Sequence, residues 1–274
     1  SVAAMIESTC RAAGLQTGLF TSPHLVSWRE RIRIGGACIS EEQVAALADE
    51  VRPAVEQVGS EGLRGPSFFE ALTAMGMLAF ERAGLDLCVL ETGLGGRLDA
   101  TNVVTPELSV ITTLGLDHTR VLGTTLPAIA REKAGIIKTE IPVVSAPQRP
   151  EAMRVIRDTS ANRGAPLITV GDDWLWRFEG SDLSGQRLTV YTPGHEGAPE
   201  FPHLSVPLLG FHQLENACTS VAAIQVLARG GVAVGNDALR QGLATVQWPG
   251  RMEVLGQAPL VVVDGARNAY SVKR

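Results

Sequence analysis

The hydrophobic pattern of the chain alternates between short apolar runs and longer stretches in which apolar residues recur every three or four positions. The short runs predict β-strands, within residues 14–22, 87–90, 108–113, 141–145, 166–170, 206–209 and 260–264. The longer stretches predict helices, at residues 1–13, 40–58, 67–84, 126–138, 151–163, 212–230 and 237–246. Strands that alternate with helices predict an α/β fold, with a mostly parallel sheet that helices cover on both faces.

Three stretches add to this picture. Between residues 172 and 191, aromatic residues alternate with charged ones, which predicts antiparallel strands. The helix at 67–84 is apolar almost all round, so we expect it to be buried. The run at 260–264 predicts a buried strand that starts a second, Rossmann-like α/β domain, after a break at 248–250. We therefore place the domains at 1–247 and 248–274.

Polar residues gather where the predicted strands end. Glu91 follows one apolar run directly, and Asp117 and His118 follow the next one. Ser22 precedes Pro23, which restricts Ser22 to an extended conformation at the end of a strand. In parallel α/β sheets, ligands bind at the carboxyl ends of the strands. We therefore expect these side chains to converge on one crevice.

Composition narrows the class of protein. The chain has 274 residues, 45% of them hydrophobic, and a formal net charge of -5, which argues against a nucleic-acid partner. No apolar run reaches the roughly 18 residues that a membrane span needs, and the first residues do not resemble a signal peptide. The four cysteines share no metal-binding spacing. We expect buried free thiols and a cytoplasmic protein with neither a membrane nor a nucleic-acid partner.

Ordered motifs carry a family resemblance. They read SVAAMIES, TSPHL with ERIRI, SFFEALTAMGMLAF, ETGLGGRLDATNV, ITTLGLDHTRVLG, IAREKAGIIK, FHQLENA, PGRMEV and VVVDGARN. With these motifs the chain resembles the folylpolyglutamate synthase/dihydrofolate synthase family of the Mur ligase superfamily. The resemblance implies a Mur-ligase-type ATPase domain in a monomeric enzyme. It also implies a reaction in which ATP is cleaved while L-glutamate is joined to the carboxyl group of dihydropteroate or of a folate.

Amide formation from a carboxylate requires activation, commonly as an acyl phosphate. This chemistry needs Mg²⁺ held by oxygen ligands and positive charge near the transferred phosphoryl group. Glu91 suits a metal ligand by residue type, and Ser22 offers a neutral oxygen. The resemblance assigns the metal ligands as Ser22, Glu91 and His118. It also implies that Lys133, in the EKAGI motif, is carbamylated and helps to hold a second Mg²⁺.

Further roles come from the resemblance alone. It implies that the pterin part of the substrate is lined by Phe68, Phe69, Glu70, Leu98, Asp99 and Ala100. It implies that ATP is contacted by Ser1, Asn216, Arg251 and Asp264. The catalytic residues on this interpretation are His118, Lys133 and Asp264.

Ordinary structural roles stay open for the same residues. Glu91 and Asp117 are also candidates for turn or helix caps, His118 for a loop histidine, Ser22 for a turn residue and Lys133 for a solvated helix lysine. The two phenylalanines suit the core, and Asn216 suits a water-facing position on its helix. Arg251 suits a salt bridge in a linker, and Asp264 suits a strand-end cap. The glycines of GLGGR suit either a close approach to a ligand or a tight turn.

The chain departs from the family pattern in three ways. The phosphate loop TNGKGS should precede Val2, and Ser1 matches only its last residue. The family motif DGAHNP reads DGARNA, with Arg267 and Ala269 at the changed positions. Most of a carboxy-terminal domain has no counterpart. We expect the chain as given to be inactive, with exposed sheet edges that favour self-association. The alternatives are another Mur-type amide ligase and a non-catalytic fragment that keeps a binding surface.

Overall fold

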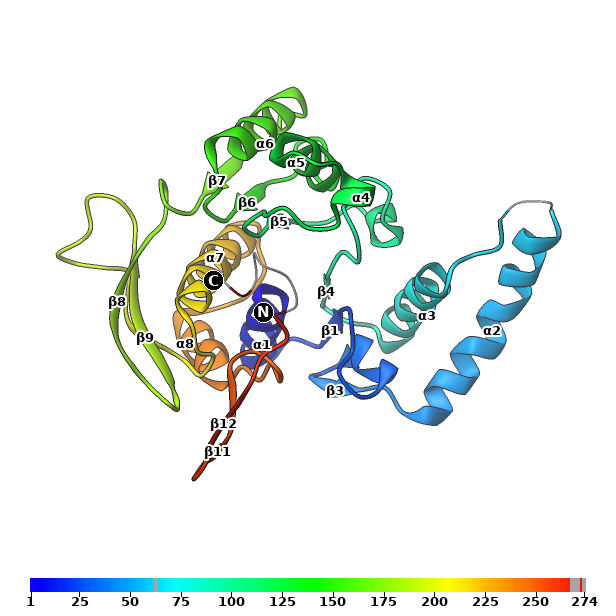
Figure 1. Cartoon of the computed structure of the whole chain (residues 1–274), viewed down its shortest axis with the longest axis horizontal. Coiled ribbons are helices and arrows are strands. Elements are labelled where there is room, and N and C mark those ends of the chain that lie inside the picture. Colours follow the sequence, from blue (N-terminus) through cyan, green and yellow to red (C-terminus); the bar gives the residue numbers. More distant parts are fainter. Residues whose placement is uncertain (62–63, 267–271, 273–274) are drawn as a thin grey trace.

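The computed structural model describes residues 1–61, 64–266 and 272 (Figure 1). It has a mixed sheet of order β3-β2-β1-β4, in which β1 and β4 run parallel and the others antiparallel. The elements of this part are α1 (Val2–Ala12), β1 (Thr17–Phe20), η1 (Trp28–Arg31), β2 (Ile32–Ile34), β3 (Ala37–Cys38) and β4 (Leu87–Leu90). All four residues of β1 and Ile32 of β2 are buried, whereas β4 is at most half-buried.

A second sheet is fully parallel, in the order β5-β6-β7. Its part of the chain contains η2 (Ala100–Val103), β5 (Ser109–Ile111), α4 (Thr119–Leu122), α5 (Leu126–Ala134), β6 (Val143–Ser145), α6 (Pro150–Asn162) and β7 (Leu167–Thr169). Side chains of α5 and α6 pack with the strands in a core of their own. Within the described residues, β4 and β5 each lie at the end of a sheet and are not paired with each other.

The largest core lies under an antiparallel sheet. Here β8 (Leu175–Asp182), β9 (Gly185–Tyr191) and β10 (Phe201–Val206) pack against α1, α7 (Phe211–Arg229) and α8 (Asn236–Thr245). The prediction of antiparallel strands in this region is therefore confirmed. Helices α1 and α8 approach closely where Gly242 faces Thr9, and the hydroxyl of Ser8 donates to the Gly242 carbonyl at 2.8 Å.

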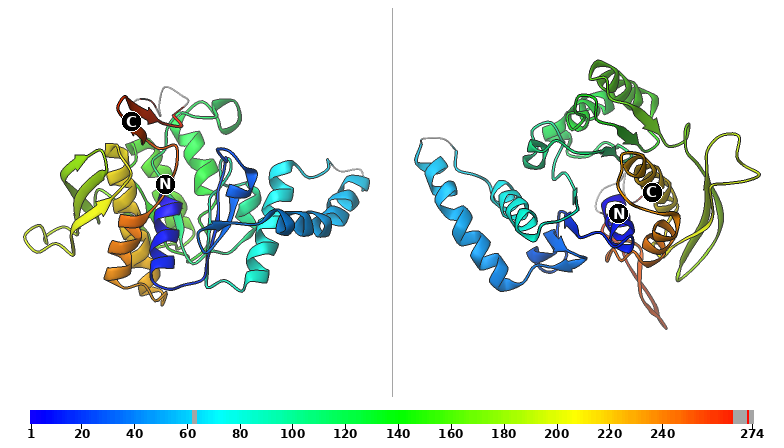
Figure 2. Two further views of the ribbon diagram at one scale, coloured as in Figure 1. Left: turned by 90° about the horizontal axis from the view of Figure 1, so that it is seen from below. Right: turned by 180° about the vertical axis from the view of Figure 1, so that it is seen from behind.

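Helices α2 (Glu41–Ser60) and α3 (Phe68–Ala83) project on the side of the molecule opposite to β8–β10 (Figures 1 and 2). Both begin with the capping box that their sequences predict. In α3, the Ser67 side chain accepts from the Glu70 amide, and the Glu70 carboxylate accepts from the Ser67 amide. The prediction that α3 is buried holds for one face only. Its first residue, Phe68, is exposed.

The last described strands form a hairpin. β11 (Glu253–Gln257) pairs antiparallel with β12 (Leu260–Val263). We predicted a buried strand at 260–264, and this is wrong: all four residues of β12 are exposed. The reason is that β12 pairs only with β11 in the described part of the chain, and its apolar side chains have no covering layer there.

Two smaller expectations are also settled. All four cysteines are free, as predicted, but Cys38 and Cys88 are exposed rather than buried, because both lie on incompletely covered strands. The expected α/β class is confirmed. Strand β1 pairs parallel with β4, and β6 pairs parallel with both β5 and β7, whereas the other pairs of strands are antiparallel. No helix in the described residues combines the length and the apolar character needed to cross a bilayer.

Candidate functional site

Glu91 and Ser22 lie together because β4 and β1 are parallel neighbours. The Glu91 amide donates to the Phe20 carbonyl at 2.8 Å, which continues the pairing past the end of the strand. The Glu91 carboxylate then accepts from the Ser22 amide at 3.0 Å. The carboxylate is therefore bound to the end of the neighbouring strand rather than to the glycine-rich loop that follows it. Strand ends bring these two predicted metal ligands together, as the sequence indicated.

A chain of side-chain hydrogen bonds links the start of α1 to α7. The amide nitrogen of Asn216 donates to the Gln213 side-chain oxygen at 3.0 Å. Gln213, which is 0% exposed, donates in turn to the Ser1 hydroxyl at 3.2 Å. Asn216 is half-buried and partnered, so the interpretation of it as a water-facing residue is wrong. Gln213 was not among the predicted site residues, although its position three residues before Asn216 places both on one helix face.

Two charged side chains from distant segments lie near Ser1. The Glu91 carboxylate and the Arg251 guanidinium are both close enough for their charges to act on this residue. Both charged groups therefore lie near the first residue of α1. Arg251 makes no ion pair within 4.0 Å among the described residues, so the linker salt bridge is not found.

Lys133 lies half-buried in the last turn of α5, where the charges of two carboxylates act on it. Burial lowers the pKa of its ammonium, while the charges of Asp117 and Asp99 act in the opposite direction. A fully solvated lysine would not show this desolvation, so the interpretation of Lys133 as a solvated helix residue is wrong. The position is partly enclosed and its charge is opposed by two carboxylates.

His118 lies next to Asp117, one of the two carboxylates that act on Lys133. Its side chain is exposed, and its Nε2 lies 3.8 Å from the Asp117 carboxylate. The Asp117 carboxylate also accepts from the His118 amide at 2.8 Å, and His118 has a φ of 49° at the start of α4. Left-handed backbone is uncommon for a residue with a Cβ. The imidazole and Lys133 thus share Asp117 as a neighbour.

The glycine-rich loop after β4 positions Lys133 by docking on α5. A Cβ at Gly96 would lie 2.8 Å from the Glu132 carbonyl and 2.9 Å from the Lys133 carbonyl. The Arg97 amide donates to the Glu132 carbonyl at 2.8 Å, and their side chains form an ion pair at 3.0 Å. Glycine is therefore required for close helix packing here.

The predicted metal ligands fall into two groups in the structure. One joins Ser22 to Glu91, and the other places His118 and Lys133 around Asp117. Within the described residues, no group of three or more histidine, cysteine, aspartate or glutamate side chains is placed to hold a metal ion. The oxygen atoms of Ser22 and Glu91 nevertheless match the preference of Mg²⁺ for few hard ligands.

The two phenylalanines expected at the substrate behave differently. Phe69 packs 5.9 Å from the Phe20 ring, against Gly93, so the core interpretation is confirmed for it. Phe68 is 63% exposed, so the core interpretation is wrong for it. It is the first residue of α3 and precedes the apolar face of the helix. The Glu70 carboxylate is occupied by its capping role and by an ion pair with Arg64 at 3.1 Å.

The other predicted substrate residues lie on the loop before η2. Leu98 is exposed, and Ala100 is the half-buried first residue of η2. The Asp99 carboxylate accepts from the amides of Leu94 and Thr101, which fixes the loop. Because Asp99 also lies near Lys133, this loop adjoins the lysine.

Asp264 closes the hairpin. Its carboxylate accepts from the Met252 amide at 2.8 Å and from the Ala266 amide at 2.6 Å. The strand-end cap is therefore confirmed as one role of Asp264, whereas its nucleotide and catalytic roles stay predictions. The departures from the family motif at Arg267 and Ala269 lie outside the described residues.

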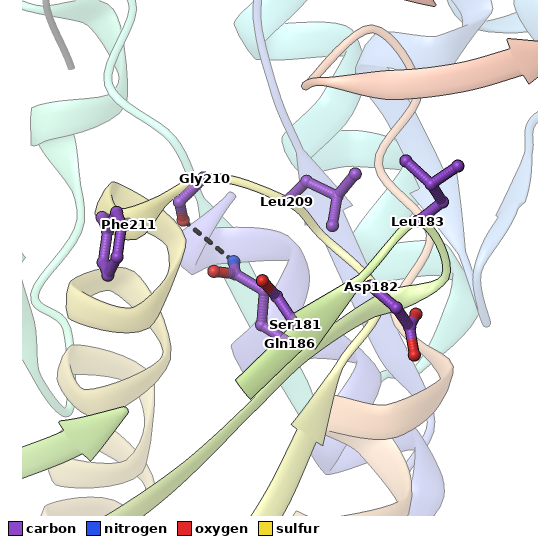
Figure 3. A pocket seen from close by; sticks show the side chains of 7 residues that line it. All are labelled: Ser181, Asp182, Leu183, Gln186, Leu209, Gly210 and Phe211. Atoms are coloured by element: carbon purple, nitrogen blue, oxygen red, sulfur yellow. Dashed lines mark hydrogen bonds between the residues drawn. The ribbon is translucent and has the colours of Figure 1, made fainter. Parts of the chain in front are cut away.

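A hollow elsewhere contains none of the predicted site residues. It lies between the β8–β9 turn and the start of α7 (Figure 3), lined by Ser181, Asp182, Leu183, Gln186, Leu209, Gly210 and Phe211. The Gln186 amide nitrogen donates to the carbonyls of Leu208 and Gly210 and is therefore already engaged in fixing this turn.

The sequence of this chain matches known proteins over most of its length. The family model for the Mur ligase middle domain matches residues 47–224. A dihydrofolate synthase/folylpolyglutamate synthase of Bacillus subtilis is 39% identical over 276 residues, which cover 100% of this chain and 63% of that protein. The folylpolyglutamate synthase of Lacticaseibacillus casei is 36% identical, over 98% of this chain and 62% of that protein.

Solved structures agree in fold. A folylpolyglutamate synthase complex with AMPPCP and folate superimposes with a TM-score of 0.92 at 34% identity, over 99% of this chain and 66% of that one. An Escherichia coli FolC complex with DHPP and ADP gives a TM-score of 0.85 at 33% identity, covering 98% and 60%. The chain thus spans less than two thirds of the length of these relatives.

Proposed function

This chain belongs to the Mur ligase family, and from that membership we propose that it is the ATP-binding part of a glutamate ligase. The proposed reaction adds L-glutamate to dihydropteroate or to a folate, with ATP as the second substrate and an acyl phosphate as the intermediate. The observation that carries the proposal is the junction at the ends of β1 and β4. There, the Glu91 carboxylate accepts from the Ser22 amide at 3.0 Å, and the Arg251 guanidinium lies near Ser1.

We assign the groups for this chemistry as follows. Bound Mg²⁺ would neutralise charge on the phosphate oxygens of ATP. Ser22 and Glu91 supply oxygen ligands for it, and His118 is the third proposed ligand. Arg251 has a planar guanidinium suited to phosphate, and it lies near Ser1 without an ion pair in the described chain. We assign it to hold the phosphoryl group, with Asn216 and Asp264 as further nucleotide contacts.

Lys133 fits the proposed carbamylation. The neutral amine attacks the carbon of CO₂, an N–C bond forms, and a proton leaves. Burial lowers the pKa of Lys133 and so increases the neutral fraction that reacts. The resulting carbamate would face Asp117 and Asp99, and three negative groups around one position require a cation between them. A second Mg²⁺ meets that requirement.

The remaining assignments follow from the same proposal. Phe68, Leu98 and Ala100 border the pterin-binding region, with Phe69, Glu70 and Asp99 holding the surrounding backbone in place. The partners are small molecules, and the proposed location is the cytoplasm, which four unpaired cysteines fit. We further propose that the protein acts as a monomer.

The test is substrate-dependent release of ADP, measured on the chain extended with the phosphate loop and the carboxy-terminal domain that the family pattern implies, because the chain as given is expected to be inactive. We expect release that requires Mg²⁺, L-glutamate and either dihydropteroate or tetrahydrofolate. A muramyl substrate in place of the pterin should give none. Release with the muramyl substrate alone would assign the chain to another branch of Mur ligases. Tight binding of pterin without any release would support a non-catalytic binding protein instead.

A further inference from the structure

Three alternate arginines follow the loop that contains Ser22, and their side chains differ in their partners. Arg29 donates to the Ile39 carbonyl at 3.2 Å and pairs with Glu41 at 3.6 Å. Arg33 donates to the Glu30 carbonyl at 3.2 Å. Arg31 instead donates through Nε to the His24 Nδ1 at 2.9 Å. Among the described residues it has neither an oxygen acceptor nor an ion pair.

The carboxylates next to Arg31 and Phe68 along the chain are engaged with other groups. Glu30 accepts from the amides of Leu25, Val26 and Ser27. Glu70 accepts from the Ser67 amide and pairs with Arg64. Burial lowers the pKa of the Arg31 guanidinium, and no anion pairs with it among the described residues. Its outer nitrogens are therefore available to a carboxylate of a ligand.

The surroundings of the guanidinium are apolar and open. Its Cζ lies 5.6 Å from the centre of the Phe68 ring, which is 63% exposed. Leu25 and Val26 on the same loop are also exposed, at 56% and 92%. An aromatic group next to a carboxylate would find apolar surface here and, beside it, the two outer nitrogens of the guanidinium fork.

Arg31 is connected directly to the junction. Its carbonyl accepts from the Thr21 amide at 3.0 Å. The next residue is Ser22, whose amide binds the Glu91 carboxylate. The backbone of Arg31 is therefore held beside the strand end that carries Ser22.

We propose that Arg31 binds a carboxylate of the substrate that is not the one being activated, beside the exposed ring of Phe68. This inference rests on the proposed function and goes further, because it names a residue that distinguishes the two substrate types. Dihydropteroate has a single carboxylate, and the reaction uses it. A folate has an α-carboxylate on its glutamate that remains free, and that group is the ligand assigned to Arg31.

The test compares dihydrofolate with dihydropteroate, which differ by one glutamate. Binding is measured by calorimetry for the unchanged protein, for Arg31→Gln and for Arg31→Lys. Arg31→Gln should weaken dihydrofolate binding about tenfold, as expected for a charged hydrogen bond, and dihydropteroate binding by less than about twofold. Arg31→Lys keeps the charge without the fork, so it should lie between the two.

Arg29→Gln is the matched control, because Arg29 lies on the same segment with its partners satisfied. It should leave both affinities unchanged, and thermal unfolding of each variant shows whether it is folded. Equal losses for the two ligands in Arg31→Gln, or no loss for either, would overturn the carboxylate assignment while leaving the ligase proposal intact. If the unchanged protein bound neither ligand, both the substrate assignment and the role of Arg31 would fall.

Discussion

At the scale of single residues, the environment of each side chain separates the candidates that sequence left equal. Lys133 resembles a surface lysine in its helix, yet burial lowers its pKa and two aspartates face it. Phe68 and Phe69 are adjacent, yet one is exposed and the other packs on Phe20. The type of a residue indicates which roles are chemically suitable for it. Whether its side chain can take such a role depends on the neighbours that other segments of the chain provide.

The pH dependence of stability tests the environment of Lys133. Its pKa is lowered from 10.5 by burial, so the folded state binds the proton less tightly than the unfolded state does. The destabilisation is therefore complete below the lowered pKa, and stability recovers as pH rises from that pKa towards 10.5. Chemical unfolding across this range, in CO₂-free buffer so that Lys133 carries a free amine, should show that the unchanged protein gains stability and Lys133→Met does not.

Lys138→Met serves as the control, since the Lys138 ammonium donates to the Asn102 carbonyl at 2.8 Å. It should keep the alkaline gain in stability. An identical pH profile for Lys133→Met and the unchanged protein would contradict the buried environment assigned to Lys133.

At the scale of elements, loops and helix ends place the chemistry. The loop at 93–97 binds α5 by backbone contacts, and this brings the Asp99 segment to Lys133. The parallel pair β1–β4 brings Ser22 to Glu91. Both arrangements depend on backbone fit between elements that are far apart in the sequence.

Substitution of Gly96 tests the first of these contacts. A Cβ at this position would lie within 3.0 Å of two carbonyl oxygens of α5. Gly96→Ala should therefore lower the free energy of unfolding by about 1–3 kcal/mol, as overpacking does, measured by urea denaturation. Gly59→Ala is the control, because no atom lies within 4 Å of the added methyl group in α2. It should stabilise by about 0.5–1 kcal/mol. Equal stability of the Gly96→Ala variant and the unchanged protein would contradict the close docking.

At the scale of the whole molecule, the positions of most helices and strands were predictable from the sequence, whereas the burial of individual strands was not. Apolar β-branched runs located β4 to β7, and alternation located β8 and β9, because side-chain periodicity reflects the backbone directly. Exposure of β12 and of Cys88 was not predictable, because burial depends on what other segments pack against a strand. The same distinction applies to the site. The strand-end rule paired Ser22 with Glu91, whereas the Ser1–Gln213–Asn216 chain depends on the packing of α1 against α7.

The central claim is that the junction at the ends of β1 and β4 performs ATP-dependent ligation. The most direct measurement is the rate of ADP release by the chain extended with the phosphate loop and the carboxy-terminal domain, with saturating Mg²⁺, L-glutamate and dihydropteroate, for Glu91→Ala beside Glu107→Ala. Loss of a metal-holding carboxylate removes several kcal/mol of charge stabilisation, so Glu91→Ala should reduce the rate by at least about a hundredfold. Glu107 is exposed, so Glu107→Ala should leave the rate unchanged. Full activity of Glu91→Ala would contradict the claim.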